Sequence, residues 1–305
     1  MLMSPQNFQD LGINFFVLLK TEGIQSFCII FHPKERLRIM KFEDFTLNDL
    51  EHLPSLEPPN WGSLSPRFTR FVQSDHCSPV KLTLNSTTIG IGTTIRHEDT
   101  AWLACIIVHP DHRNKGLGKL ITEYLIDSLD RNRFQSIYLI ATELGYPVYK
   151  KLGFELEKEY VHLKTEEELP ESELSPDIIS YKEAFREEVM KLDASITGEN
   201  RINSLKDHLK TSLLFIEDGA VTGYYLPSLG EGHILASTTQ AGTALMKARL
   251  QNSKIAIFPS DNNVANDLAK EMGFKQYTIS RRMVLGKKKE WNSLNMYNRI
   301  GGHLG

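Results

Sequence analysis

The sequence has few cysteines and little net charge, and both deficits exclude classes of protein. Only three of the 305 residues are cysteines, Cys28, Cys77 and Cys105, and none of them forms a CxxC pair. A zinc site is therefore not predicted, and an odd number of cysteines without a secretory signal favours reduced thiols in the cytoplasm. The net charge of −3 provides no basic surface for nucleic-acid phosphates, so we expect no nucleic-acid partner.

Long apolar runs are also missing. The most apolar N-terminal stretch, residues 13–31, is interrupted by Lys20, Glu22 and Gln25, which makes it too polar to span a bilayer. We therefore expect no membrane partner. Apolar residues make up 41% of the chain and charged residues 24%, as is typical of a folded protein. A length of 305 residues exceeds what one hydrophobic core usually serves, which predicts two domains.

The order of predicted elements in the first half indicates a mixed α/β sheet. Residues 80–84 and 88–95 are rich in β-formers and flank a turn signal at Asn85-Ser86-Thr87. Residues 101–108 are almost continuously apolar, which fits a strand buried on both faces. After Gly116, apolar residues recur every three or four positions and predict a helix facing the sheet. Strands and helices then alternate, which is typical of an α/β fold.

The second half repeats this order weakly. Gly223 corresponds to Gly90, and the segment Lys270-Glu-Met-Gly-Phe corresponds to Lys150-Lys-Leu-Gly-Phe. We therefore predict two copies of one fold, with chance similarity among short elements as the alternative. The predicted divisions are an N-terminal extension (1–36), a first domain (37–163), an acidic linker (164–177), a second domain (178–290) and a C-terminal tail (291–305).

The segment from Val108 to Leu120 carries the most chemical information. Gly116 and Gly118 let backbone N–H groups approach a bulky anion, and the first turn of the following helix leaves unpaired donors with about half a positive charge. Arg113 and Lys115 add formal positive charge. The arrangement suits a pyrophosphate, although glycines also serve turns for conformational reasons alone. It is neither a Walker loop nor a Rossmann fingerprint.

This segment resembles the signature of the GNAT acyltransferases, Arg/Gln-x-x-Gly-x-Gly/Ala, here Arg113-Asn-Lys-Gly116-Leu-Gly118, preceded by Val108-His-Pro110. A later family motif, Tyr-x-Lys-x-Gly-Phe, is matched by Tyr149-Lys-Lys-Leu-Gly153-Phe154. The resemblance covers residues 37–163. It implies an α/β (α+β mixed sheet) fold with two tandem GNAT-like domains, and an acetyl-CoA site within residues 101–154.

In this family acetyl-CoA is the cosubstrate and lies where two strands splay, which implies residues 104–108 and 136–140 here. The pantetheine arm would pair with the backbone of Ile106, Ile107 and Val108. The pyrophosphate would be held by the backbone N–H groups of Arg113, Asn114, Lys115, Gly116, Leu117, Gly118 and Lys119.

The resemblance also bears on proton transfer. Tyr149 falls where many members keep a tyrosine near the CoA sulfur, so we expect it to be the general acid. The alternative is a tyrosine packed against the sheet. The general base is not identified, because the central strand begins Ala101-Trp-Leu where some members have a carboxylate. His97, Glu98 and Asp99 are candidates through a water molecule, or else form a solvated turn. Cys105 is expected to be an inert core thiol.

The second copy departs from the motif at its own site. Its turn, residues 236–244, keeps Gly242 but has neither the arginine nor the Gly-x-Gly spacing, and Ala269 stands in place of Tyr149. It resembles the C-terminal acetyltransferase-like domain of tandem GNAT proteins, including the ending Arg281-Arg-Met, so we expect a structural domain. In the tail, the apolar residues Trp291, Tyr297 and Ile300 indicate that this segment packs against another surface.

The sequence therefore predicts an N-acetyltransferase that moves an acetyl group from acetyl-CoA to a primary amine of a small molecule by direct attack, without a metal. Two alternatives stay open. One is a non-catalytic acyl-CoA-binding or scaffolding protein, which the missing carboxylate favours. The other is a protein N-acetyltransferase, which would need an open groove. We expect a cytoplasmic monomer or weak homodimer.

Overall fold

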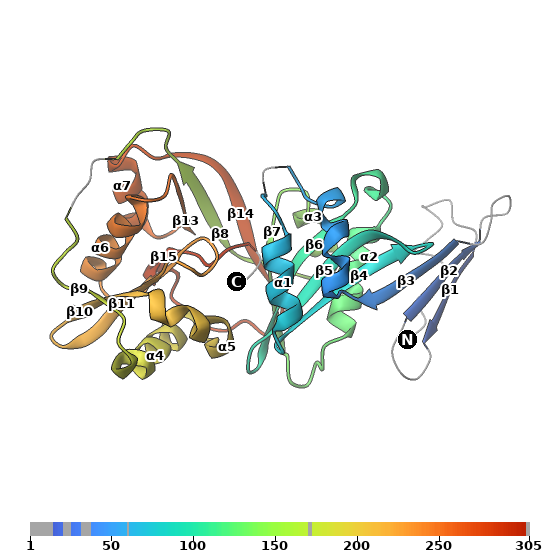
Figure 1. Ribbon diagram of the computed structural model, residues 1–305, viewed down its shortest axis with the longest axis horizontal. Coiled ribbons are helices and arrows are strands. Elements are labelled where there is room, and N and C mark those ends of the chain that lie inside the picture. The colour runs from blue at the N-terminus through green and yellow to red at the C-terminus, as the bar shows by residue number, and fades with distance from the viewer. Residues whose placement is uncertain (1–14, 21–25, 32–37, 60, 170–172, 303–305) are drawn as a thin grey trace. The chain divides into compact units, whose positions relative to one another are not determined.

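The computed structural model describes residues 15–20, 26–31, 38–59, 61–169 and 173–302. They form two compact units, and Figure 1 labels their helices and strands. The first unit contains the described residues up to Ile95 together with Leu103–Asp130, and the second contains Arg96–Trp102 and the chain from Arg131 onward. Much of the predicted N-terminal extension, linker residues 170–172 and the last three residues of the tail lie outside the described residues.

The first unit is built on an antiparallel sheet. Each of its first four strands pairs with the next in chain order, and β6 follows β5 in the sheet. The elements are β1 (Phe15–Lys20), β2 (Ser26–Phe31), β3 (Arg38–Asp44), the 3-10 helix η3 (Leu47–Ser55), α1 (Ser65–Gln73), β4 (Cys77–Leu84), β5 (Thr87–Arg96), β6 (Thr100–Val108), the 3-10 helix η4 (Pro110–His112) and α2 (Leu117–Asp127). The predicted turn between β4 and β5 is present: Asn85 and Ser86 both have positive φ, 48° and 68°, as a tight hairpin of two residues requires.

Helix α2 lies against β5 at two glycines. A Cβ atom at Gly90 would lie 2.7 Å from Ile121 Cδ1, and one at Gly92 would lie 2.9 Å from Leu125 Cδ1. Both Ile121 and Leu125 are fully buried. The helix therefore approaches the strand more closely than any residue with a side chain would allow.

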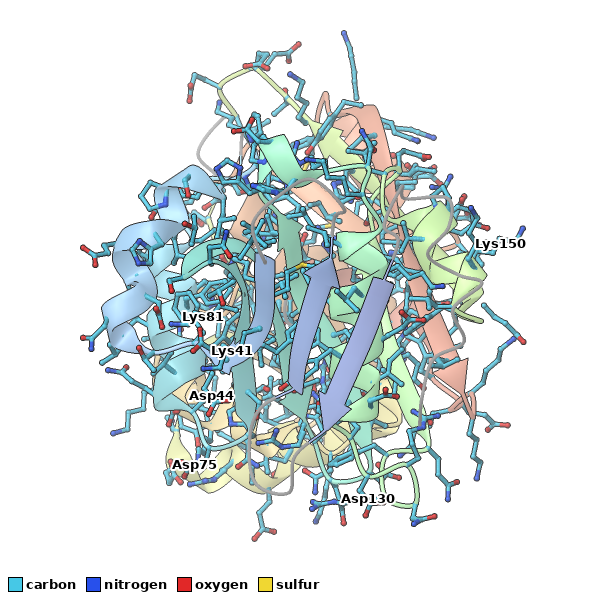
Figure 2. The ribbon with its side chains drawn as sticks, turned by 90° about the vertical axis from the view of Figure 1, so that its right-hand side faces the viewer. Lys41, Asp44, Asp75, Lys81, Asp130 and Lys150 are labelled. Carbon is cyan, nitrogen blue, oxygen red and sulfur yellow. The ribbon has the colours of Figure 1, made fainter. Side chains whose placement is uncertain are left out.

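The two faces of strands β3 and β4 differ in chemistry. On one face, the ring of Phe42 stacks on Tyr124 of α2 with centroids 3.9 Å apart. On the other face, Lys41 pairs with Glu43 at 2.7 Å, and Lys81 lies beside them (Figure 2). This alternation is what a strand with one buried face requires, and it fixes how the sheet presents its polar side.

The second unit contains two sheets. The first has the strand order β7-β14-β8-β13, and the second has the order β15-β12-β11-β10-β9. The elements of this unit are β7 (Ser136–Ala141), α3 (Tyr146–Lys151), β8 (Glu155–Lys164), β9 (Ile178–Ser180), η5 (Glu183–Phe185), α4 (Arg186–Thr197), α5 (Ile202–Leu205), η6 (Lys206–Thr211), β10 (Leu213–Glu217), β11 (Ala220–Leu226), β12 (His233–Ala236), α6 (Thr239–Leu250), β13 (Ile255–Pro259), α7 (Asn263–Glu271), β14 (Lys275–Gly286), η7 (Ser293–Asn295) and β15 (Met296–Asn298).

Strand exchange joins the two halves of the sequence within this unit. The long strand β14 lies between β7 and β8 and is antiparallel to both, and β8 in turn pairs with β13 (Figure 1). At one register position, Arg282 of β14 is opposite Ile140 of β7 and Lys158 of β8. The last long strand of the second half thus completes the sheet of the first half.

The internal repeat is visible in the element order. The series β4-β5-β6-α2-β7-α3-β8 recurs as β10-β11-β12-α6-β13-α7-β14. Gly223 of β11 serves as Gly90 does in β5, because a Cβ atom there would lie 2.9 Å from Leu245 Cδ1 of α6. The prediction of an α/β fold with two copies is confirmed, while the ranges proposed for the domains stay predictions. No helix in the described part of the chain combines the length and the apolar character needed to cross a membrane.

Candidate active site

The turn between β6 and α2 is held by backbone hydrogen bonds, one of them to β5. The amide of His109 donates to the carbonyl of Ile89 on β5 at 2.9 Å, and the short helix η4 follows at once. Asn114 and Gly116 then adopt positive φ angles of 59° and 72°. The two positive φ angles turn the chain into the first turn of α2. At Gly116 the positive φ explains why the residue is glycine.

The N-terminus of α2 is open. Gly116 is the N-cap residue and has no side chain to accept from the first turn, and no acidic residue lies in that turn. The N–H groups of Leu117, Gly118 and Lys119 have no intrahelical acceptor, as at the start of any helix. A Cβ atom added at Gly118 would have no neighbour nearer than Val108 Cγ2 at 4.0 Å. No other part of the described chain therefore fills the position that a side chain at Gly118 would take.

The cationic side chains of the loop contact the loop itself. Arg113 Nε donates to the carbonyl of Val108 at 3.1 Å, and Lys115 Nζ donates to the carbonyl of Asp111 at 2.8 Å. Both side chains are exposed, whereas Leu117 is buried beneath the turn. The predicted binding residues of the loop and the end of β6 are thus brought together in one unit, with backbone N–H groups as the anion donors and fixed positive charge beside them.

Strand β6 contains a backbone irregularity that the sequence did not indicate. Cys105 has a φ of 50° in the middle of the strand, a conformation rare for a residue with a side chain. Beyond it, Ile107 is buried, and Ile106 and Val108 are half-buried. Burial raises the pKa of the Cys105 thiol to about 11, against the opposing effect of Arg67, so this cysteine is a poor nucleophile at neutral pH.

Tyr149 belongs to the second unit, where its neighbours fix its ring. It lies on α3 and is buried, with its ring 6.0 Å from that of Phe154 in an edge-on arrangement. A Cβ atom at Gly145 would lie 2.7 Å from Tyr149 Cε2, so the ring packs directly on the backbone at the start of its helix.

The residues weighed as general bases lie in the hairpin between β5 and β6. Glu98 and Asp99 are exposed; Glu98 accepts from Asn200 Nδ2 at 3.0 Å, and Asp99 accepts from Lys289 Nζ at 2.7 Å. His97 is buried, and its amide donates to the carbonyl of Thr100 at 2.9 Å. Both carboxylates are therefore engaged in holding the hairpin to residues of the second half.

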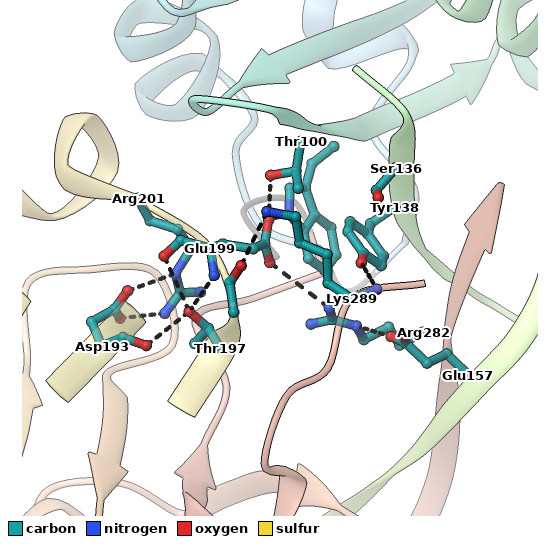
Figure 3. Close-up of polar contacts among 12 residues, drawn as sticks. Thr100, Ser136, Tyr138, Glu157, Asp193, Thr197, Glu199, Arg201, Arg282 and Lys289 are labelled. Atoms are coloured by element: carbon teal, nitrogen blue, oxygen red, sulfur yellow. Dashed lines mark hydrogen bonds and ion pairs between the residues drawn. The ribbon is translucent and has the colours of Figure 1, made fainter. Parts of the chain in front are cut away.

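A charged cluster, formed by the buried Glu199 and Arg282 with the half-buried Glu157, was missed from the sequence. The carboxylate of Glu199 accepts from Thr100 Oγ1 at 2.6 Å and from Trp102 Nε1 at 2.9 Å. Arg282 pairs with Glu157 and lies 3.8 Å from Glu199, so Glu199 stands between Thr100 and Arg282 (Figure 3). The only signal in the sequence was the motif Arg281-Arg-Met, which marks Arg282 but not its partners.

Burial and charge have opposite effects on Glu199. Burial alone would raise the pKa of its carboxyl group, but the guanidinium of Arg282, with His97 and Arg201, lowers that pKa below its ordinary value. Glu199 is therefore a carboxylate at neutral pH. The guanidinium of Arg282 is in turn surrounded by the rings of Trp102, Tyr138 and Trp291, at 4.9, 4.5 and 4.4 Å from its centre.

The corresponding helix start in the second copy is filled by protein groups. Thr238 caps α6, with its hydroxyl accepting from the amide of Ala241 at 3.2 Å. A Cβ atom at Gly242 would lie 2.1 Å from the ring of Tyr297, which belongs to the C-terminal tail. The start of α6 is thus closed to an anion by the Thr238 cap and by the ring of Tyr297.

Comparison with known proteins agrees with this geometry. Residues 81–156 match the family model of the acetyltransferase (GNAT) domain. Among solved structures, a proposed acetyltransferase from Pyrococcus horikoshii is 22% identical, with a TM-score of 0.74 over 90% of this chain and 99% of its own. A GCN5-related N-acetyltransferase from Sphaerobacter thermophilus is 12% identical, with a TM-score of 0.57 over 83% and 98%.

A tandem GNAT protein from the clavulanic acid biosynthesis pathway is 10% identical, with a TM-score of 0.53 over 82% of this chain and 99% of its own. At these identities the likenesses establish the fold. No curated protein sequence matches the chain. Residues 81–156 thus match a GNAT acetyltransferase domain, a class of enzyme that uses acyl-CoA as the acyl donor, and the chain shares its fold with the solved structures of the proposed acetyltransferase and the tandem GNAT protein. The predictions of the superfamily and of an enzyme are confirmed.

Proposed function

We propose that this protein is an N-acetyltransferase that moves the acetyl group of acetyl-CoA to a primary amine of a small molecule, and that it acts in the cytoplasm. The main support for the proposal is the open first turn of α2, which has a glycine N-cap and no acidic residue, and in which a Cβ atom at Gly118 would meet no other part of the described chain nearer than 4.0 Å. Such a turn has the donors and the space that a pyrophosphate needs. The filled counterpart at Gly242 supports a single active copy.

The residues divide the work of binding. Backbone N–H groups of residues 114–119 would hold the pyrophosphate, since the amide of Arg113 already donates to the carbonyl of Pro110 at 3.2 Å. The backbone of Ile106, Ile107 and Val108 would pair with the pantetheine arm. The bound thioester supplies an activated acyl group. Holding it in line with the amine can account for as much as about 7–11 kcal/mol of the barrier.

Proton transfer completes the reaction. The neutral amine attacks the thioester carbonyl carbon, the carbon–sulfur bond breaks, and the Tyr149 hydroxyl gives its proton to the departing thiolate. The proton that the nitrogen loses as the amide forms restores the Tyr149 hydroxyl. The buried ring of Tyr149, packed on Gly145 and Phe154, supports a fixed position for that hydroxyl.

A single substitution tests whether the open first turn of α2 binds the pyrophosphate. Gly118→Ala adds a methyl group with no protein neighbour nearer than 4.0 Å, and alanine is favoured over glycine in a helix by about 0.5–1 kcal/mol. We expect the variant to be as stable as the wild type or more so, yet to bind CoA at least about tenfold more weakly, because the methyl group enters the space of the phosphates. Titration calorimetry with CoA and thermal melts measure the two effects.

The reaction itself is followed by release of free thiol from acetyl-CoA in the presence of an amine library. Turnover with small amines supports the proposal. Thermal stabilisation by CoA without thiol release would instead indicate a binding or scaffolding protein, and turnover with peptide N-termini alone would indicate a protein N-acetyltransferase. Unchanged CoA affinity in Gly118→Ala would contradict the proposal that the start of α2 binds the pyrophosphate.

A further inference from the structure

One arginine of the first unit lacks the carboxylate partner that two buried arginines of the second unit have. Arg201 pairs with Asp193 at 2.6 Å, and Arg299 pairs with Glu231 at 2.8 Å. Arg67, on α1, is half-buried, and no carboxylate among the described residues forms an ion pair with it. Its positive charge is therefore not neutralised by the part of the chain that the structure describes.

Within the described residues, Arg67 makes its side-chain contact with a thiol. Its Nη1 lies 4.0 Å from Cys105 Sγ on β6, which is a long contact to a weak acceptor. Burial raises the pKa of Cys105 to about 11, so the sulfur carries no negative charge at neutral pH. A guanidinium has five N–H donors, and this one contact leaves the others for a ligand or for water.

The place of this contact on β6 is informative. The proposed function assigns the pyrophosphate to residues 114–119 and the pantetheine arm to residues 106–108, so the bound molecule would run along β6 from its end towards its beginning. The next residue in that direction is Cys105, where the positive φ of 50° interrupts the strand. The thioester would therefore lie beside Cys105, with Arg67 next to it. All of these residues belong to the first unit.

We propose that Arg67 binds a carboxylate of the acceptor, so that the substrate is a primary amine that also carries a carboxylate, as an amino acid does. This inference rests on the proposed function and names its class of substrate. The planar fork of a guanidinium matches the two oxygens of a carboxylate. A carboxylate also carries the single negative charge that one guanidinium neutralises, whereas a phosphate group carries up to about two.

The role of Arg67 is to bind rather than to react. Its guanidinium would contact a substrate group that does not change in the reaction, and would therefore stabilise the bound substrate and the transition state equally. Loss of such an interaction raises KM and leaves kcat nearly unchanged. The half-buried position of Arg67 strengthens the pairing, because partly buried charges are screened less than exposed ones.

The test uses the full chain, acetyl-CoA and pairs of acceptors, each pair being an amino acid and its amide. The amide keeps the amine and the size of the substrate but removes the negative charge. In the wild type we expect kcat/KM to be at least about tenfold higher for the amino acids. In Arg67→Met, kcat/KM for the amino acids should fall by about 10–100-fold, mainly through KM. For the amides it should change by less than about twofold.

Arg70→Met is the matched control, because it removes the same charge from an exposed position of the same helix. We expect it to change kcat/KM for neither group of acceptors. Arg67→Lys keeps the charge without the fork and should show an intermediate loss for the amino acids; it also serves if Arg67→Met does not fold. Each variant is compared with the wild type on the same acceptor, so differences in amine pKa between an amino acid and its amide cancel.

The outcomes separate the inference from the proposed function. Equal kcat/KM for amino acids and amides in the wild type, or equal losses for both groups in Arg67→Met, would overturn the role of Arg67 and leave the acetyltransferase intact. Absence of thiol release by the wild type with every amine would overturn both. CoA affinity, measured by calorimetry, is expected to stay within about twofold of the wild type in Arg67→Met, and a larger loss would also overturn the role in acceptor binding.

Discussion

Single residues in this molecule are constrained by their neighbours, and Tyr149 is an example on which the proposed chemistry depends. The position of its ring is set by the backbone of Gly145 beneath it and by the edge of Phe154. A hydroxyl on such a ring loses little entropy when it meets a reacting atom, because the side chain is already ordered.

Tyr149→Phe tests the general acid. The substitution keeps the packing and removes only the hydroxyl, so we expect kcat to fall by about 10²–10⁴ with unchanged CoA affinity. Tyr146→Phe is the control on the same helix, since the ring of Tyr146 carries the guanidinium of Arg281 at 4.6 Å and phenylalanine retains that contact. Steady-state kinetics with saturating acetyl-CoA measure the effect, and equal turnover in both variants would remove Tyr149 from the mechanism.

His162 allows a prediction about pH and stability. Its Nε2 lies 2.8 Å from Ser280 Oγ, which also accepts from Arg299 Nη1. Burial, reinforced by the charge of Arg299, lowers the pKa of His162 from 6.5 to about 4. The unfolded chain therefore takes up the proton first on acidification. The stability that neutral His162 contributes is present above pH 6.5 and is lost as the pH falls towards 4.

The unfolding free energy should therefore fall with decreasing pH by as much as about 1.4 kcal/mol per unit on account of this residue. In His162→Gln, which retains a polar group for Ser280 and does not titrate, that part of the slope should be missing. Urea unfolding at pH 7 and pH 5 gives the comparison. Identical slopes in the two proteins would mean that folding does not change the pKa of His162.

At the residue scale, the sequence predicted what depends on local chemistry and missed what depends on tertiary contacts. Gly116 and Gly118 were found because the backbone geometry of a strand-to-helix turn favours glycine there. The positive φ of Cys105 has no such signal, because cysteine is not a residue that favours it. Glu199 looks like any other charged loop residue until the fold places it against Trp102.

At the scale of elements, the corresponding helices of the two copies, α2 and α6, differ at their N-termini. Helix α2 begins with a bare glycine and free space, and α6 begins with the Thr238 cap beneath the ring of Tyr297. Both helices lie on a strand glycine, Gly90 or Gly223. The repeat has thus kept the packing of the helix on the sheet and lost the opening at its end.

Matched substitutions in the two helices test this contrast. Gly242→Ala places a methyl group 2.1 Å from the Tyr297 ring, so we expect a loss of about 1–3 kcal/mol from overpacking. Gly118→Ala meets no such contact and is expected to gain about 0.5–1 kcal/mol. Denaturant unfolding of both variants measures the difference, and a Gly242→Ala protein as stable as the wild type would show that the tail does not close this helix start.

Element types were largely predictable, because periodicity and turn chemistry are local. The apolar run of residues 101–108 is β6, and the helical pattern after Gly116 is α2, which ends at Asp127, an end that the sequence pattern does not mark. Helix ends are less sharply encoded than helix interiors, since the last turn is stabilised by contacts outside the helix.

At the scale of the whole molecule, the sequence did not allow us to predict which strands pair with each other. The sequence analysis names residues 136–140 as a strand and Arg281-Arg-Met as a family motif. Nothing in either segment indicates that β14 inserts between β7 and β8. A strand with suitable residues fits many partners, and the choice is made by the rest of the fold. The predicted division at 164–177 therefore marks a break in the element order without indicating which strands share a sheet.

The inserted strand predicts that the two sequence halves do not fold alone. A fragment ending at residue 169 would contain β7 and β8 without β14, leaving two unpaired strand edges, and a fragment from residue 173 would contain β14 and β13 without β8. Exposed edges of this kind aggregate. We expect each fragment, expressed separately, to be insoluble or to melt without cooperativity.

The control is the intact chain with a protease site introduced in residues 170–172 and cut after folding. Because β8 keeps β13 and β14 as partners on its two sides, we expect the cut protein to elute as one species, to melt cooperatively and to retain its affinity for CoA. A first fragment that folds and binds CoA by itself would show that the inserted strand is dispensable for the acyl-CoA domain. Loss of association after cutting would show that the covalent link, rather than the shared sheet, holds the halves together.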